Sequence, residues 1–190
     1  MSRTRVQRVR TSRIWATAER AFSRASVPSE RADLLSLLPD RYAPDVEPIE
    51  PEQERAALEA LAAFAAEFGA DDFVAGQWSG GERREDGALS LPMWLPGEVL
   101  GRFTDVCYRL GWVTPAFDWT EWIGRDENRA LLEDPSQLST ASLDDLQRVL
   151  TVTIRGERFS EGSLAAYAES GLLQAVAERA RALLGERASG

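Results

Sequence analysis

Two carboxylates, Asp126 and Glu157, are the residues whose type and position could perform chemistry. Each falls on an otherwise apolar face of a predicted helix, where a charged group is unusual. If the two side chains share a cleft, they could act as general acid and general base. Together with Asp144 or Asp145 they could instead bind Mg²⁺, which prefers oxygen ligands. A carboxylate- or metal-dependent enzyme is therefore one alternative.

A structural role for the same two carboxylates is the alternative that we favour. Arg129 follows Asp126 by three residues, and Arg155 and Arg158 flank Glu157. Ion pairs with these arginines would satisfy the carboxylates and lock the ends of the helices. Because none of these spacings is specific to a metal ion, we expect neither a metal nor a cofactor.

The composition excludes many other kinds of catalysis. The chain has 190 residues, and its 22 basic residues are all arginine, so it contains neither lysine nor histidine. The missing lysine excludes Schiff-base enzymes and the phosphate-binding P-loop. The missing histidine excludes imidazole bases and histidine ligands to zinc or haem. The single cysteine, Cys107, lies on an apolar helical face, which predicts a buried and unreactive thiol and a reducing, cytoplasmic location.

The charge is distributed very unevenly along the chain. Residues 1–24 contain seven arginines and one acid, a net charge of +6, whereas the remaining residues contain 15 arginines and 30 acids, a net charge of −15. Residues 1–25 are predicted to form a basic arm with an amphipathic helix. The arm could bind a nucleic acid or an acidic protein surface, its own or that of a second copy, through Arg3, Arg5, Arg8, Arg10 and Arg13.

The rest of the chain has the pattern of amphipathic helices. Residues 26–50 are predicted to be a short helix followed by a proline-rich connection, and residues 51–188 to be a helical domain. The helix expected over residues 51–68 ends at Gly69 in a left-handed cap. Further helices are expected over residues 98–110, from Asp118 toward Leu132, after Ser142, and over residues 163–170 and 172–184. The pattern predicts a mainly α, single-domain bundle of about seven or eight helices with one small β-hairpin near residues 72–95.

Six tryptophans are many for a chain of this length, and five of them lie between the predicted hairpin and the helices that follow it. They could form a partner-binding face, since tryptophan is enriched at interaction hot spots. The alternative that we favour is that most of them fill the core, with one or two reaching the surface. The candidate partner-binding residues are Trp78, Trp94, Trp119, Trp122, Arg155, Glu157, Arg158 and Phe159.

Several short segments of this region together resemble a known family. They are Gly80-Gly81, Leu91-Pro92, Gly111-Trp112-Val113, Phe117-Asp118-Trp119 with Trp122, and the run from Arg155 through Arg158 and Phe159 to Gly162. The order is similar to that of a bacterial family of domains of unknown function with F-D-W…W and R-x-x-R-F-x-x-G segments, over about residues 73–184. The resemblance implies a natural domain but no activity. We expect Arg155 and Arg158 to bind carboxylates or helix ends, Phe159 to anchor the turn and Gly162 to permit a close crossing.

The sequence favours a non-catalytic, cytoplasmic protein-interaction or regulatory module, with self-association through the basic arm as one form of it. A nucleic-acid-associated protein that binds through the arm is the second alternative. The carboxylate- or metal-dependent enzyme is the third. A membrane is not expected as a partner, because the apolar stretches are too short to span a bilayer.

Overall fold

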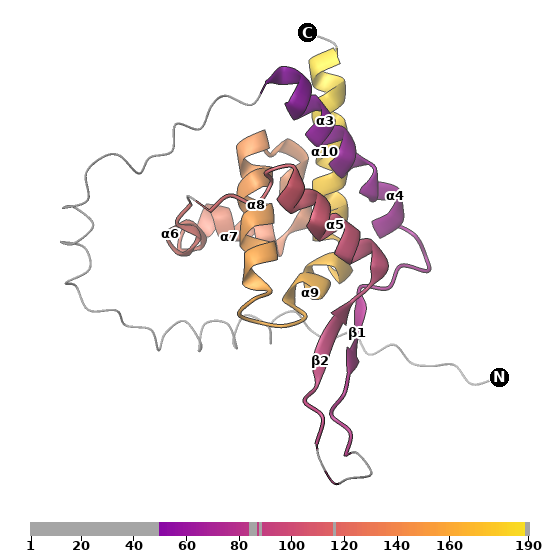
Figure 1. Cartoon of the computed structure of the whole chain (residues 1–190). Helices are drawn as coiled ribbons and strands as arrows, with labels where there is room; N and C mark the ends of the chain where they lie inside the picture. Colours follow the sequence, from indigo (N-terminus) through magenta and orange to yellow (C-terminus); the bar gives the residue numbers. More distant parts are fainter. Residues whose placement is uncertain (1–49, 84–86, 88, 116, 189–190) are drawn as a thin grey trace, which may run out of the picture. The chain divides into compact units, whose positions relative to one another are not determined.

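The computed structural model describes residues 50–83, 87, 89–115 and 117–188. The predictions for the basic arm and for the proline-rich connection fall on residues 1–49 and lie outside the described residues. Glu50–Gly190 forms one compact unit. Its described residues are mainly helical and include a two-stranded antiparallel hairpin, as the sequence predicts (Figure 1). None of the helices described is both long enough and apolar enough to cross a membrane.

Helices and turns account for most of the unit. In chain order, the elements are α3 (Pro51–Ala62), α4 (Phe64–Phe68), β1 (Gly76–Ser79), β2 (Met93–Pro96), α5 (Glu98–Arg109), α6 (Trp119–Ile123), α7 (Asp126–Glu133), the 3₁₀ helix η2 (Pro135–Thr140), α8 (Leu143–Gly156), α9 (Ser163–Glu169) and α10 (Leu172–Ala188).

The helix predicted over residues 51–68 is present but is divided at Ala63 into α3 and α4. Pro51 occupies its first turn, where the missing N–H costs nothing. The left-handed cap predicted at Gly69 is wrong. Gly69 has a φ of −86° and continues the right-handed turn, with its N–H donating to the carbonyl of Ala65 at 3.2 Å.

The hairpin pairs Gly76 with Pro96 and Trp78 with Trp94, so its strands are shorter than the predicted β-compatible runs, and each begins later along the chain. A bridge between Arg83 and Leu89 continues the pairing toward the tip. The hairpin projects from the helical part of the unit, as Figure 1 shows. Because this sheet has two strands, both are edge strands, and proline is tolerated in edge strands.

Gly97 joins the hairpin directly to α5. It is the residue that precedes the first turn of α5, and its N–H also donates to the carbonyl of Ala75 at 2.8 Å. A Cβ atom at this position would lie 2.1 Å from the carbonyl oxygen of Val74, so that only glycine fits. The hairpin therefore passes into the helix with no linker between them.

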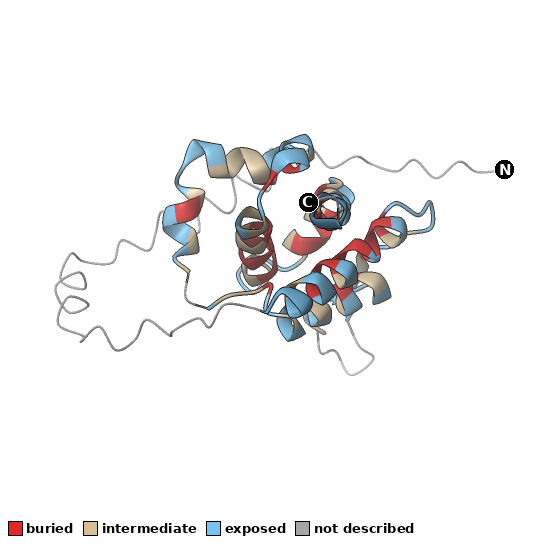
Figure 2. Cartoon of the chain, turned by 90° about the horizontal axis from the view of Figure 1, so that it is seen from above, coloured by how far each residue is buried: buried red, intermediate tan, exposed pale blue. Residues whose placement is uncertain are grey.

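The core of the unit lies between α10 and the elements packed around it. Helix α10 contacts α3, α4, α9 and η2, and Figure 2 shows the buried sides of the helices facing one another. Phe103 of α5 is fully buried, with its ring 5.2 Å from that of Phe64 and 5.1 Å from that of Phe68. The other large, fully buried apolar side chains are Leu58, Leu61, Leu100, Leu138, Leu146, Val149, Leu150, Leu172, Leu173 and Val176.

Helix α8 begins directly after Ser142, as the sequence predicts, and its residues from Val149 to Ile154 are all buried. The hydroxyl of Ser142 accepts from the N–H of Asp145, whose carboxylate accepts from the N–H of Ser142. Further along, the buried hydroxyl of Thr151 accepts from the N–H of Thr114 at 3.1 Å and donates to the carbonyl of Gln147 at 2.8 Å. The bond from Thr114 fastens the segment that leads to α6 onto α8.

Candidate partner-binding surface

Trp78 and Trp94 face each other across the hairpin. They form a non-hydrogen-bonded pair, in which cross-strand side chains approach most closely. Their ring centroids are 5.5 Å apart at an interplanar angle of 70°. Trp78 is 56% exposed, and a Cβ atom on Gly162 would lie within 3.8 Å of both rings. The turn between α8 and α9 therefore rests against the two indoles. These are ordinary van der Waals distances, so glycine is favoured here by its φ of +83° and not by the close crossing that the sequence predicts.

Phe159 lies in the same turn and is 70% exposed. One face of its ring is stacked on Trp119, with centroids 5.7 Å apart and an interplanar angle of 26°. Trp119 is the first residue of α6, so the turn lies between α6 and the hairpin, as Figure 1 also shows. We call Trp78, Trp94, Trp119 and Phe159 the aromatic surface.

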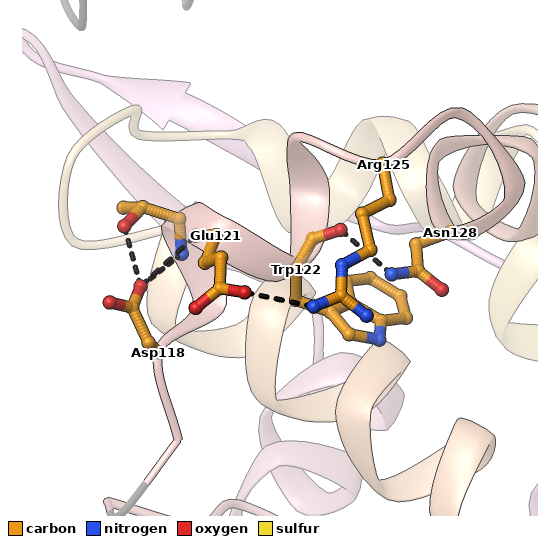
Figure 3. A network of polar contacts seen from close by, with 6 residues as sticks. Asp118, Glu121, Trp122, Arg125 and Asn128 are labelled. Atoms are coloured by element: carbon orange, nitrogen blue, oxygen red, sulfur yellow. Dashed lines mark hydrogen bonds and ion pairs between the residues drawn. The ribbon is translucent and has the colours of Figure 1, made fainter.

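A network of polar contacts holds α6, and with it Trp119 (Figure 3). The carboxylate of Asp118 accepts from the N–H groups of Thr120 and Glu121, each at 3.0 Å, and from the hydroxyl of Thr120 at 2.6 Å. The Glu121 side chain does not complete the capping box that its spacing suggests, because it pairs with Arg125 at 2.8 Å. Asp118 is thus the residue that starts the helix beneath the aromatic surface.

Removing this cap should have an effect that depends on pH. The hydrogen bond from the Thr120 hydroxyl, followed by that from the Glu121 N–H, holds the pKa of Asp118 below its ordinary value. A lowered pKa in the folded state stabilises the protein above the unfolded-state pKa, and this stabilisation is lost as the pH falls through the folded-state pKa. We expect Asp118→Ala to lower the urea midpoint at about pH 7 and to have little effect at about pH 2. An equal loss at both values would contradict this account.

Glu157 fixes the turn that carries Phe159. Its carboxylate accepts from the N–H of Gly162 at 2.6 Å, from the N–H of Leu164 at 2.7 Å and from the hydroxyl of Ser163 at 3.1 Å. The N–H groups of Gly162 and Leu164 lie at the start of α9, where backbone N–H groups have no acceptor within the helix. Glu157 therefore caps α9 from the end of the preceding helix.

Glu157 and Asp126 do not act as a pair. The side chain of Asp126 is 95% exposed and lies 3.5 Å from Arg129. The prediction that it projects from an apolar face is wrong because the helix expected from Asp118 is interrupted after Ile123, so that Asp126 begins α7 instead. No group of three or more histidine, cysteine, aspartate or glutamate side chains in the described part of the chain could hold a metal ion.

Arg155 and Arg158 do not bind Glu157. Arg155 donates to the carbonyl of Thr114 at 3.3 Å, and Arg158 donates to the hydroxyl of Tyr108 at 3.4 Å. The expected contact with a carboxylate is replaced because Glu157 is engaged by the backbone of α9. Tyr108 is half-exposed and was not among the residues predicted from the sequence, although its position off the apolar face of residues 98–110 indicates that it faces outward.

Trp122 does not reach the surface. It is only 4% exposed, and its ring lies 6.0 Å from that of Phe117. Trp112 is buried as well, so these two tryptophans belong to the core. Trp78 is exposed, and Trp94 and Trp119 are only partly buried, so fewer of the five fill the core than we favoured. Cys107 is also fully buried, and burial raises the pKa of its thiol far above the ordinary value, which makes it unreactive.

Comparison with known proteins identifies a family but no activity. Searches of curated proteins and of solved structures give no significant match. A family model described as "Family of unknown function (DUF6508)" matches residues 53–186, from α3 to the last turns of α10. The match spans every element that builds the aromatic surface and excludes the basic arm. The chain therefore belongs to a family of unknown function, DUF6508.

Proposed function

We propose that residues 50–190 form a protein-interaction module that binds a partner protein through the aromatic surface. The observation that carries the proposal is Phe159, which exposes 70% of its surface although the turn around it is fixed on both sides. Exposed apolar side chains held in a rigid setting are characteristic of interaction sites, because a partner can bury them at little cost in conformational entropy.

The neighbours of Phe159 support this role. Trp119 covers one face of its ring and leaves the other face free to be covered by a partner. Trp78 lies beyond Gly162 at the other end of the turn and is more than half exposed. Arg158 adds a guanidinium beside Tyr108. Tryptophan, tyrosine and arginine are the residue types that most often supply the binding energy of protein interfaces.

Photo-crosslinking tests the proposal. A photoreactive phenylalanine analogue at position 159 should crosslink one protein when the full chain is expressed in its native cell, and the same analogue at exposed Ala182 of α10 should not. Crosslinks that are identical at both positions, or absent at position 159, would contradict a specific surface there.

Phe159→Ala should weaken binding of the purified partner about tenfold or more, because truncation of a central aromatic anchor typically costs that much. Calorimetry with the full-length chain measures this effect. Leu91→Ala is the control, since Leu91 is also apolar and exposed but lies outside the aromatic surface. An equal loss of affinity in both variants would indicate general stickiness of the surface rather than a binding site.

The basic arm supports a second, separate proposal, which rests on charge. Residues 1–24 carry a net charge of +6 and the rest of the chain carries −15, so the arm is suited to bind an acidic surface of a second copy or the phosphates of a nucleic acid. We also propose a cytoplasmic location, because the single cysteine, Cys107, forms no disulfide and a reducing compartment is consistent with that.

Deletion of residues 1–13 should separate the two alternatives for the arm. If the arm drives self-association, sedimentation velocity should show an oligomer for the full chain and a monomer for the deleted chain. If it binds nucleic acid, the full chain should bind a labelled DNA or RNA oligomer at low salt, and the affinity should fall steeply with added salt. If the full chain is monomeric and does not bind the DNA or RNA oligomer, both alternatives are removed.

A further inference from the structure

The outer edge of β1 has free backbone hydrogen-bonding groups. The bond from the N–H of Gly97 to the carbonyl of Ala75 fixes the alternation of the hairpin, so that Gln77 and Ser79 also bond to β2. Gly76 and Trp78 must then direct their N–H and C=O groups away from β2. In the described part of the chain the sheet has only these two strands, and neither N–H bonds to another element.

The outer edge of β2 offers fewer free N–H groups to a further strand than the outer edge of β1 does. The same alternation directs the backbone groups of Trp94 and Pro96 outward, and Pro96 has no N–H. Pro92, which directly precedes the strand, lacks one as well. Proline at such positions prevents a further strand from pairing. The hairpin therefore offers one protected edge and one open edge.

A groove lies at the base of the hairpin. It has a volume of about 510 Å³ and lies between the segment that follows α4, the bases of the two strands and the start of α5. Val74, Leu95 and Val99 contribute apolar side chains to it. Gln77 and Leu95, which line it, point to the face of the hairpin opposite to Trp78 and Trp94, because neighbouring residues in a strand alternate between faces. The groove is therefore separate from the aromatic surface.

The charges around this groove are mostly negative. Glu67, Asp72 and Glu98 all line it. Arg102 pairs with Glu67 and lies 3.8 Å from Glu98. No other ion pair with these three carboxylates is present among the described residues. Three carboxylates against one guanidinium leave an excess of negative charge around the groove.

We infer that the outer edge of β1 accepts an extended segment of a partner protein as a third strand, with a basic residue of that segment beside Asp72. The free N–H and C=O groups favour an extended occupant over a helix, because a helix satisfies its own backbone. The excess of carboxylates favours a basic segment over an acidic one. A second copy of β1 does not fit this preference, since its sequence, Gly-Gln-Trp-Ser, contains no basic residue.

Amide hydrogen exchange in the full-length chain tests the inference directly. The probe is a synthetic peptide of alternating valine and threonine that ends in arginine, and its control carries glutamate in place of the arginine. We expect the amides of Gly76 and Trp78 to exchange quickly in the free protein and about tenfold or more slowly with the arginine peptide. Unchanged exchange at these two amides, or equal protection by the glutamate peptide, would overturn the proposal.

Two pairs of variants measure separately how much the Asp72 carboxylate and the outward N–H of Trp78 contribute to peptide binding. Asp72→Asn should weaken binding of the arginine peptide several-fold more than Asp71→Asn, which makes the same change at an exposed neighbour that does not line the groove. Trp78→Pro should bind the peptide about tenfold more weakly than Trp78→Ala, because only proline removes the outward N–H. Equal affinities within either pair would contradict the predicted mode. A dimer of the wild type that Trp78→Pro alone dissociates would assign the edge to a second copy and would also overturn the proposal.

Discussion

Replacement of Phe103 by alanine is expected to lower the free energy of unfolding by about 3–5 kcal/mol. Phe103 is completely buried, and its ring packs edge-on against those of Phe64 and Phe68. Alanine would lose the transfer free energy of the ring and leave a cavity where α5 meets α4. Because a typical domain is stable by only about 5–15 kcal/mol, this one substitution would remove a large share of the total.

The measurement is equilibrium unfolding in urea, and the matched control is Phe159→Ala. The control removes the same atoms from a ring that is 70% exposed, so we expect a change of about 0.5 kcal/mol or less. A similar loss in the two variants would mean that Phe159 supports the fold, and it would weaken the argument that this side chain is exposed for a partner.

Replacement of Glu157 by alanine is expected to lower the free energy of unfolding by about 2–3 kcal/mol. The carboxylate accepts two backbone N–H groups and one hydroxyl at the start of α9. Hydrogen bonds to a charged acceptor are among the stronger ones, and alanine would leave their half-buried donors without a partner. The first turn of α9 should then fray, and the turn with Gly162 should move away from the two indoles of the hairpin.

Glu157→Gln separates the cap from a simple effect of side-chain size. Glutamine retains one oxygen for either Gly162 or Leu164, but it places an NH₂ donor against the N–H of the other. We therefore expect glutamine to restore little of the stability lost in Glu157→Ala. Unfolding in urea measures both variants, and amide exchange at Leu164 reports the loss locally. A glutamine variant as stable as the wild type would contradict the capping role.

The elements with strong local signals could be predicted from the sequence. The helix over residues 98–110 has a continuous apolar face, and Ser142 is followed by the first-turn acids Asp144 and Asp145, so α5 and the start of α8 lie where the pattern places them. The helix expected from Asp118 shows the limit of periodicity. The apolar pattern continues across the break after Ile123, and a helical projection cannot detect that the chain changes direction there.

The candidate surface was predicted less completely, because exposure is decided by tertiary packing. Trp78 and Trp122 are the same residue type in the same region, yet one is largely exposed and the other is buried. Nothing local distinguishes them, since the difference arises from the projection of the hairpin and the docking of α6 on α8. The partners of Glu157 were missed for a similar reason. Its sequence neighbours suggest arginines, whereas the fold brings the free N–H groups of α9 to it.

The absence of a linker at Gly97 has a mechanical consequence. This residue donates the last hydrogen bond at the base of the hairpin and directly precedes the first turn of α5, so no residue is left to form a flexible joint between them. Within the second turn of α5, Phe103 is anchored in the aromatic part of the core. We therefore expect a force applied near the tip of the hairpin to be transmitted to the packing around Phe103, because no flexible joint lies between them to absorb it.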